Sequence, residues 1–147
     1  MGVRVFTIGY SGMQIAEFIG VLKAHGIEEV VDVRSFPTSR KEDFCKEKLR
    51  EHLKSSGISY CHLRALGGYR RPSYLAYTRT GEFRRGIEEL IRRARSRRIA
   101  VMCLETNPRH CHRRFIAREL EKRGVEVVHI IGGRGIPSLS RTSPPES

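Results

Sequence analysis

Short apolar runs alternate with amphipathic segments along most of the chain. The apolar runs have the length of buried strands and cover residues 3–8, 29–33, 58–63, 99–103 and 125–131. The segments between them carry apolar residues at helical spacing, as in Phe83, Ile87, Leu90 and Ile91. Residues 64–80 lack such a period, and we expect a long loop there. The pattern therefore predicts strands separated by helices.

This alternation predicts an α/β fold, a single-domain three-layer sandwich around a mostly parallel five-stranded sheet of Rossmann-like type. The expected strand order is 3-2-1-4-5, with a topological switch point between the first and fourth strands. We expect the α/β domain to span residues 1–133. Residues 134–147 are rich in Gly, Pro and Ser, which predicts a flexible C-terminal tail.

The length and cysteine content narrow the class of protein. At 147 residues the chain is long enough for one domain with its own core. It has no apolar segment of about 18 residues and no charged-then-apolar leader, so we expect a cytoplasmic protein without membrane contact. The four cysteines form no C-x-x-C pair, which argues against a zinc ribbon. The sequence specifies neither a cofactor nor an oligomeric state.

The chain is strongly basic, with a formal net charge of +12. Much of this charge falls on the predicted third helix and its exit, at Arg84, Arg85, Arg92, Arg93, Arg95, Arg97 and Arg98. Such a surface is typical of nucleic-acid binding, although an arginine-rich helix face can also be simply solvated. Tyrosines and arginines interleaved within residues 69–79 could stack on bases or pin the loop to the core.

The densest group of reactive side chains lies in residues 103–113, CLETNPRHCHR, directly after the fourth apolar run. Asn107 is a favourable N-cap and Pro108 suits the first helical position, which predicts a helix beginning there. Two thiols, a carboxylate, an imidazole and a guanidinium thus gather around one strand-to-helix turn. In parallel α/β sheets, ligands bind at this carboxyl edge.

Several chemistries fit this turn. Cys103 and Arg109 have the C-x5-R spacing of cysteine-dependent phosphatases, but Glu105 and the stiff Asn107-Pro108 cap oppose phosphate binding there. Cys103, Glu105, Cys111 and His112 are all zinc-ligand types. Adjacent residues of a helix point about 100° apart, so Cys111 and His112 would not easily reach one ion. We assign no metal ligands.

Charged residues at the ends of other elements offer acid–base chemistry or substrate recognition. Asp32 and Arg34 lie at the end of the second apolar run. Arg113 lies near the start of a predicted helix, where a cation opposes the helix dipole. That placement favours a partnership between Arg113 and Glu105 or an anionic ligand. A structural ion pair and a functional site remain equally open here.

Motifs spread over the chain support a resemblance to a known family. They are TIGYS at 7–11, VDVR at 31–34, YCHL at 60–63, LGG at 66–68 with Arg70, MCLE at 102–105 and CHR at 111–113. With these motifs, residues 7–130 resemble the family called domain of unknown function 488. The resemblance implies a compact α/β domain and no established reaction. Tyr10 stands where many relatives carry histidine.

The leading hypothesis is an enzyme that acts on a phosphate-bearing substrate, either a nucleotide or a nucleic acid. The candidate catalytic residues are Asp32, Cys103 and Glu105. The candidate substrate-binding residues are Thr7, Gly9, Tyr10, Ser11, Arg34, Gly68, Arg70, His112 and Arg113, with the three arginines holding the anion. The alternatives are a non-catalytic nucleic-acid-binding module and a metal-binding protein.

Overall fold

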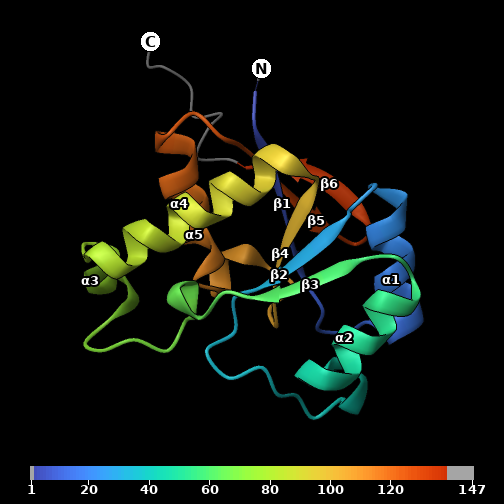
Figure 1. Ribbon diagram of the computed structural model, residues 1–147. Coiled ribbons are helices and arrows are strands. Elements are labelled where there is room, and N and C mark those ends of the chain that lie inside the picture. The colour runs from blue at the N-terminus through green and yellow to red at the C-terminus, as the bar shows by residue number, and fades with distance from the viewer. Residues whose placement is uncertain (1, 139–147) are drawn as a thin grey trace.

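The structure is a computed structural model that describes residues 2–138 (Figure 1). Its strands are β1 (Arg4–Gly9), β2 (Glu29–Asp32), β3 (Ser59–His62), β4 (Ile99–Cys103), β5 (Glu126–Ile131) and β6 (Arg134–Pro137). Its helices are α1 (Ile15–Ala24), α2 (Lys46–Ser55), α3 (Tyr74–Tyr77), α4 (Gly81–Ser96) and α5 (Arg113–Lys122). Three short 3-10 turns are η1 (Glu42–Phe44), η2 (Arg64–Leu66) and η3 (Pro108–His110).

The strands form one mixed sheet in the order β3-β2-β4-β1-β5-β6, in which only β6 is antiparallel to its neighbour. The predicted α/β class and the mostly parallel sheet are confirmed. The predicted strand order 3-2-1-4-5 is wrong at one place, because β4 lies between β2 and β1. Strands β1, β2 and β4 are all buried almost throughout, so their apolar patterns do not decide which of them takes the centre.

Helices cover both faces of the sheet, as the three-layer prediction requires. Figure 1 shows α1 and α2 on one side and α4 and α5 on the other. Successive β4 residues alternate between the two cores: Val101 and Cys103 pack with α4 and α5, and Ala100 and Met102 pack with α1 and α2. The chain therefore leaves β1 and β4 towards opposite faces, which makes the carboxyl edge between these strands a topological switch point.

The C-terminal part of the sheet extends further than the sequence predicts. After β5 the chain turns at Gly132 and Gly133, and Arg134–Pro137 pairs with β5 as the sixth strand. A two-glycine turn between paired strands is a common hairpin connection. The first four residues of the expected tail therefore form a strand, and residues 139–147 of that tail lie outside the described residues.

The helix expected from Pro108 is interrupted at its start. The Asn107 side chain accepts a hydrogen bond from the Arg109 amide, as expected of a cap, but the turn it starts is the short η3. Cys111 then has an extended backbone (φ −140°, ψ 152°), and α5 begins only at Arg113. The interruption places Cys111 off the helix surface.

No helix within residues 2–138 combines the length and the apolar character that a membrane crossing needs.

Candidate functional site

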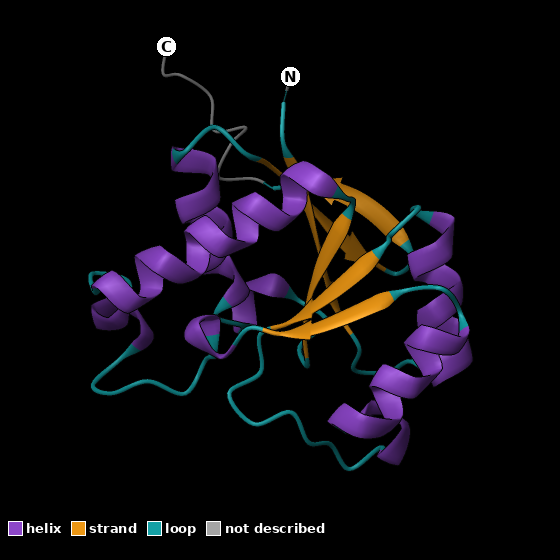
Figure 2. Cartoon of the chain, in the orientation of Figure 1, coloured by secondary structure: helices purple, strands orange, loops and turns teal. Residues whose placement is uncertain are grey.

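Loops gather at the carboxyl edge of the sheet (Figure 2). A hollow of about 540 Å³ lies there, lined by residues of the loops after β1, β2 and β4. Its lining combines two thiols and an imidazole with aromatic rings. The lining side chains used below are Tyr10, Arg34, Phe36, Gly68, Tyr69, Tyr74, Cys103, Glu105, His110, Cys111, His112, Arg114 and Phe115. The switch point predicted from the strand pattern is therefore hollowed.

Two cysteine thiols meet in the wall of this hollow. Cys103 is the last residue of β4, and Cys111 follows η3. Their Sγ atoms lie 2.6 Å apart, with both cysteines free and only 2% and 7% exposed. The extended backbone at Cys111 turns its side chain back towards the end of β4.

The surroundings of the pair place negative charge on Cys111. The hydrogen bond with Cys103 lowers the pKa of Cys111 well below its usual range, against the effect of burial, and His112 adds to this effect. The His112 Nδ1 lies 3.6 Å from the Cys111 Sγ, and the Arg113 amide donates to the same sulfur over 3.5 Å. Burial, together with its hydrogen bond to Cys111, raises the pKa of Cys103. These contacts favour negative charge on Cys111, with the S–H of Cys103 as its donor.

The orientation of His112 suits this charge. Its Nε2 lies 3.0 Å from the Val33 carbonyl oxygen, which can only accept, so Nε2 carries a proton. Its Nδ1 atom faces the Cys111 sulfur, where an N–H group would donate to a thiolate. A Cβ atom at position 68 would lie 2.6 Å from this Nδ1, so the space beside the ring requires glycine. Gly68, a predicted substrate-binding residue, thus touches the site through His112.

Arg113 is fully buried beneath the hollow and ties the turn after β4 to β1. Its Nη1 donates to the Thr7 hydroxyl oxygen (2.9 Å), and its Nη2 donates to the carbonyl oxygens of Glu105 and Thr106. No acceptor among the described residues reaches its Nε. Arg113 therefore contacts the backbone of Glu105, whereas the Glu105 side chain lies exposed at the hollow.

The turn after β1 packs closely against the loop after β4. A Cβ atom at Gly9 would overlap the Glu105 carbonyl oxygen, at 1.7 Å. The amides of Tyr10 and Ser11 donate to the carbonyl oxygens of Cys103 and Leu104. Gly9 therefore sets the close approach of the two loops, and Tyr10 reaches the hollow while Ser11 lies exposed beside it.

Asp32 and Arg34 form a buried ion pair. The Nε and Nη2 of Arg34 donate to the two Asp32 carboxylate oxygens at 2.9 and 2.8 Å, and Nη1 donates to the Phe44 carbonyl oxygen. The Tyr60 hydroxyl also donates to Asp32, over 2.5 Å. Asp32 is sealed from solvent, and the Arg34 donors are engaged within the chain.

Arg70 is also occupied by the chain's own groups. It donates to the carbonyl oxygens of Arg64 and Gly67, and its guanidinium lies 3.9 Å from the Tyr77 ring centre. The hydroxyls of Tyr74 and Tyr77 donate to Leu66 and Ala65 carbonyl oxygens. The long loop is therefore pinned to the core at these tyrosines, while Tyr69 stays exposed.

The predicted site residues thus separate into groups by position. Tyr10, Arg34, Gly68, Cys103, Glu105 and His112 surround the hollow, and Thr7, Gly9 and Arg113 lie beneath it. Asp32 pairs with Arg34 and Arg70 donates to the Gly67 carbonyl oxygen, and neither Asp32 nor Arg70 lines the hollow. Ser11 lies on an exposed turn. Phe36, Arg114 and the thiolate role of Cys111 were missed. Only the position of Cys111 near a helix start could have indicated that role.

Two further sequence hypotheses were a phosphatase-like C-x5-R motif and a metal site. Arg109 lines a separate hollow with Pro108 and His129, so the C-x5-R spacing with Cys103 does not bring the two side chains to one pocket. Among residues 2–138, no three His, Cys, Asp or Glu side chains group as a metal site would require.

Comparison with known proteins gives one result. The family model described as domain of unknown function DUF488 matches residues 14–120. The chain belongs to this family. None of the curated proteins and none of the solved structures matches the chain. For this DUF488 member, function must therefore be argued from the site.

His129 beneath the site gives a prediction for stability. The Thr7 hydroxyl oxygen accepts from Arg113, so its proton points to the His129 Nδ1, 2.6 Å away. Burial, with the nearby Arg113 charge, lowers the pKa of His129 from 6.5 to about 4. The folded state therefore resists protonation of His129, and the protein takes up a proton there when it unfolds between pH 6.5 and about 4.

We expect the free energy of unfolding to fall as the pH decreases from 6.5 towards 4. The part due to His129 amounts to roughly 2–3 kcal/mol, from about 1.4 kcal/mol per pH unit of pKa difference. Urea unfolding of the wild type and of His129→Gln, which cannot titrate, measures this difference. Parallel pH profiles for the two proteins would show that His129 is not held neutral.

Proposed function

We propose that this protein is a thiol-dependent enzyme in which Cys111 is the nucleophile. The observation that carries the proposal is the position of the Cys111 sulfur, between the Cys103 thiol and the His112 ring at the amino end of α5, on the wall of a hollow. Thiolates stabilised in this way at helix amino ends are typical of catalytic cysteines. Cys103, the nucleophile suggested by the sequence, is then its proton-donating partner.

The rim of the hollow supports a phosphate-bearing substrate with a flat ring, such as a nucleotide. Phe36 and Tyr69 are 63% and 62% exposed there, with ring centres 5.9 Å apart. Exposed aromatic rings of this kind stack well on bases. Arg114 and His110 lie on the same lining and can pair with a phosphate group. The net charge of +12 draws anions towards the protein.

The predicted arginines enter this proposal as positioning residues. Arg34 and Arg70 fix the loops after β2 and β3, and Arg113 fixes the turn that carries both cysteines. Glu105 is the carboxylate on the hollow and is proposed to move protons to and from the substrate. The proposed setting is the cytoplasm, where thiols are kept reduced.

Alkylation tests the nucleophile and the substrate class together. An ordinary thiol, with a pKa of about 8.5, is only about one part in 3,000 thiolate at pH 5. At that pH we expect iodoacetamide to label Cys111 well before Cys45 and Cys61, as measured by peptide mass spectrometry. A nucleoside monophosphate should slow the labelling severalfold, because it covers the hollow.

Two variants serve as controls. Cys111→Ser should lose the rapid label, and Phe36→Ala should keep it but lose the protection by nucleotide. Labelling of Cys111 no faster than that of Cys61 would contradict the nucleophile. Rapid labelling that no nucleotide slows would contradict the substrate class alone.

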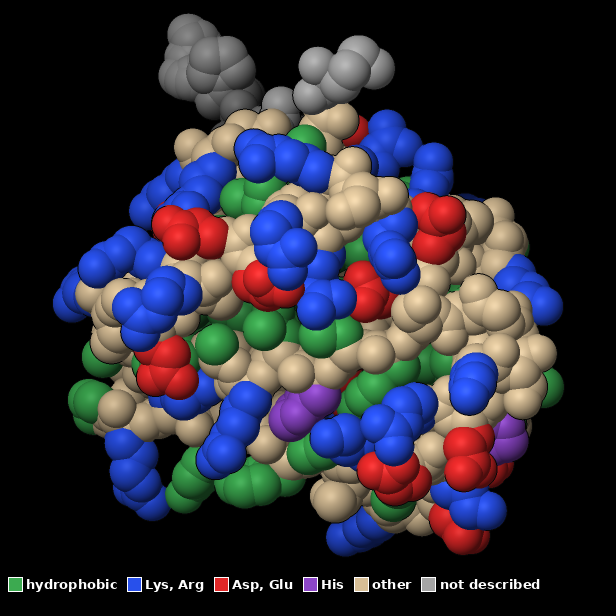
Figure 3. All heavy atoms as spheres, in the orientation of Figure 1, with side chains coloured by type: hydrophobic (Ala, Val, Ile, Leu, Met, Phe, Trp, Pro, Cys, Tyr) green, Lys and Arg blue, Asp and Glu red, His purple; other side chains and the backbone are tan. Residues whose placement is uncertain are grey.

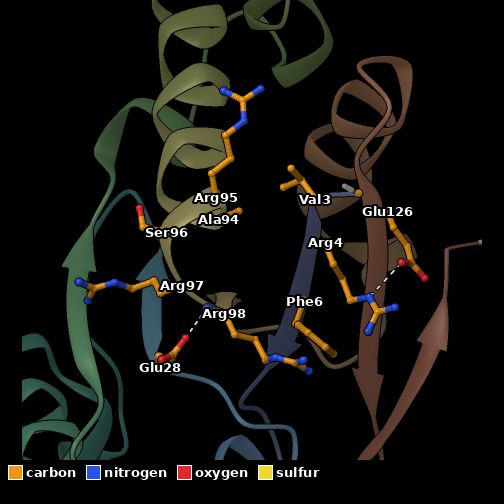
Figure 4. Close-up of a pocket in the computed structure, with 11 residues that line it drawn as sticks. Val3, Arg4, Phe6, Glu28, Ala94, Arg95, Ser96, Arg97, Arg98 and Glu126 are labelled. Atoms are coloured by element: carbon orange, nitrogen blue, oxygen red, sulfur yellow. Dashed lines mark hydrogen bonds and ion pairs between the residues drawn. The ribbon is translucent and has the colours of Figure 1, made fainter.

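A second candidate function, nucleic-acid binding, is favoured by the opposite edge of the sheet. A hollow of about 800 Å³ there is lined by Arg4, Arg95, Arg97 and Arg98, together with Glu28 and Glu126 (Figure 4). The four guanidinium groups point in different directions, which suits an extended phosphate chain better than one phosphate group.

The arginines of the neighbouring helix α4 are less free to bind nucleic acid than the sequence suggests. Lys and Arg side chains spread over the face of α4 (Figure 3), but acidic side chains lie among them. Arg92 and Arg93 pair with Glu89, and Arg93 also pairs with Glu29. Arg95, near the end of α4, has no hydrogen bond or ion pair within the described residues. Nucleic-acid binding would therefore rely on this end of the helix, where an arginine is available to bind phosphate.

We expect the double variant Arg95→Glu/Arg97→Glu to bind a single-stranded oligonucleotide more weakly than the wild type. The slope of log Kd against log salt should fall by about 1.4, at roughly 0.7 for each of the two lost phosphate contacts. Fluorescence anisotropy at several salt concentrations measures it. The matched control is Lys48→Glu/Lys54→Glu on α2, with the same change of charge. Equal slopes for all three proteins would exclude this surface.

A further inference from the structure

The Cys103–Cys111 pair is built to form a covalent bond without rearranging the fold. Disulfide sulfurs lie about 2.05 Å apart, so the observed 2.6 Å leaves about half an ångström to close. The η3 turn brings the two residues together, since it folds the chain back between them. The two sulfurs already touch, so a disulfide would replace an existing contact, and Cys111 keeps an edge on the hollow.

The other cysteines lack such a partner. Cys45 precedes α2 and its thiol donates to the Ser39 carbonyl oxygen, while Cys61 lies on β3. Within residues 2–138, neither Cys45 nor Cys61 forms a disulfide or a hydrogen bond to another sulfur. They provide internal controls in the same molecule for any reaction that requires two neighbouring thiols.

We propose that Cys111 and Cys103 are a reversible oxidation site for hydroperoxides, and that the disulfide between them switches the Cys111 nucleophile off. The proposal deepens the proposed function, and it rests on that function only in taking Cys111 as the reactive thiolate. Redox-sensing cysteines are typically thiolates with access to solvent and a second thiol nearby. Cys111 meets these conditions through the hollow and through Cys103.

The reaction has two balanced steps. The Cys111 thiolate attacks the hydrogen-bearing peroxide oxygen, an S–O bond forms and the O–O bond breaks. The alkoxide or hydroxide that leaves takes a proton from solvent and becomes an alcohol or water. Cys111 is then a sulfenic acid. The Cys103 sulfur next attacks the Cys111 sulfur, an S–S bond forms, the S–O bond breaks, and hydroxide leaves as water with the Cys103 proton. Two thiols lose two electrons and the hydroperoxide gains them.

The closeness of Cys103 determines the outcome of oxidation. A sulfenic acid that waits for a second peroxide molecule becomes a sulfinic acid, which thiols do not reverse. Here the resolving sulfur is already in contact with Cys111, so the disulfide forms first. A small dithiol restores both thiols by exchange. The geometry therefore protects the nucleophile during oxidation.

Peptide mass spectrometry after treatment with hydrogen peroxide tests the proposal. In the full-length protein we expect the peptides of Cys103 and Cys111 to become linked, with the loss of two hydrogen atoms, and dithiothreitol to reverse this. Rapid labelling of Cys111 by iodoacetamide should be lost when the disulfide forms and regained when dithiothreitol reduces it. Cys61→Ser should behave as the wild type does.

Two further variants assign the order of steps. In Cys103→Ser, Cys111 should be trapped by dimedone as a sulfenic acid and should proceed to the sulfinic acid. In Cys111→Ser, Cys103 should stay reduced. Circular dichroism shows whether each variant is folded, and the wild-type result stands without them.

Some outcomes would overturn the proposal. These are sulfinic acid at Cys111 of the wild type without a disulfide, or a disulfide that involves Cys45, Cys61 or a second molecule. If Cys111 still labels rapidly at low pH in that case, the nucleophile stands and only the redox proposal fails. A Cys103–Cys111 disulfide without rapid labelling of the reduced protein would instead contradict the proposed function.

Discussion

The buried guanidinium of Arg113 is the contact on which the arrangement of the site depends. It joins the first turn of α5, the loop after β4 and the Thr7 hydroxyl of β1 in one set of hydrogen bonds. A buried cation is costly unless nearby groups compensate its charge. Arg113 has no carboxylate partner among the described residues, and its charge acts on the Cys103 sulfur. The Thr7 hydroxyl oxygen and the carbonyl oxygens of Glu105 and Thr106 therefore compensate the buried guanidinium.

The layers of the fold follow from simple patterning. Five apolar runs and the amphipathic helices between them predict a mostly parallel sheet covered on both faces, and the structure has both. The order of the strands could not be predicted as well, because β2 and β4 are both fully buried and each would fit the centre. The β6 strand was missed since a Gly-rich segment carries no apolar alternation.

The hollow lies at the carboxyl edge between β1 and β4, where the strand pattern predicts a switch point, but one local feature of its lining is not visible in the sequence. A continuous helix from Pro108 would place Cys111 and His112 on different faces. The extended backbone at Cys111 instead directs its sulfur to Cys103 and leaves His112 beside it. Arg113 was expected to meet the Glu105 carboxylate, and it meets the Glu105 carbonyl oxygen instead. Such choices depend on tertiary packing, which residue spacing does not encode.

Thiolate absorbance in the ultraviolet directly measures the negative charge on the Cys103–Cys111 pair, on which the proposed chemistry depends. The protein is titrated from pH 9 towards pH 3, alongside Cys111→Ser. One thiolate should persist in the wild type far below the usual thiol range and be absent from the variant throughout the acidic range. If the wild-type absorbance instead disappears near the pKa of an ordinary thiol, about 8.5, the account of the site is contradicted.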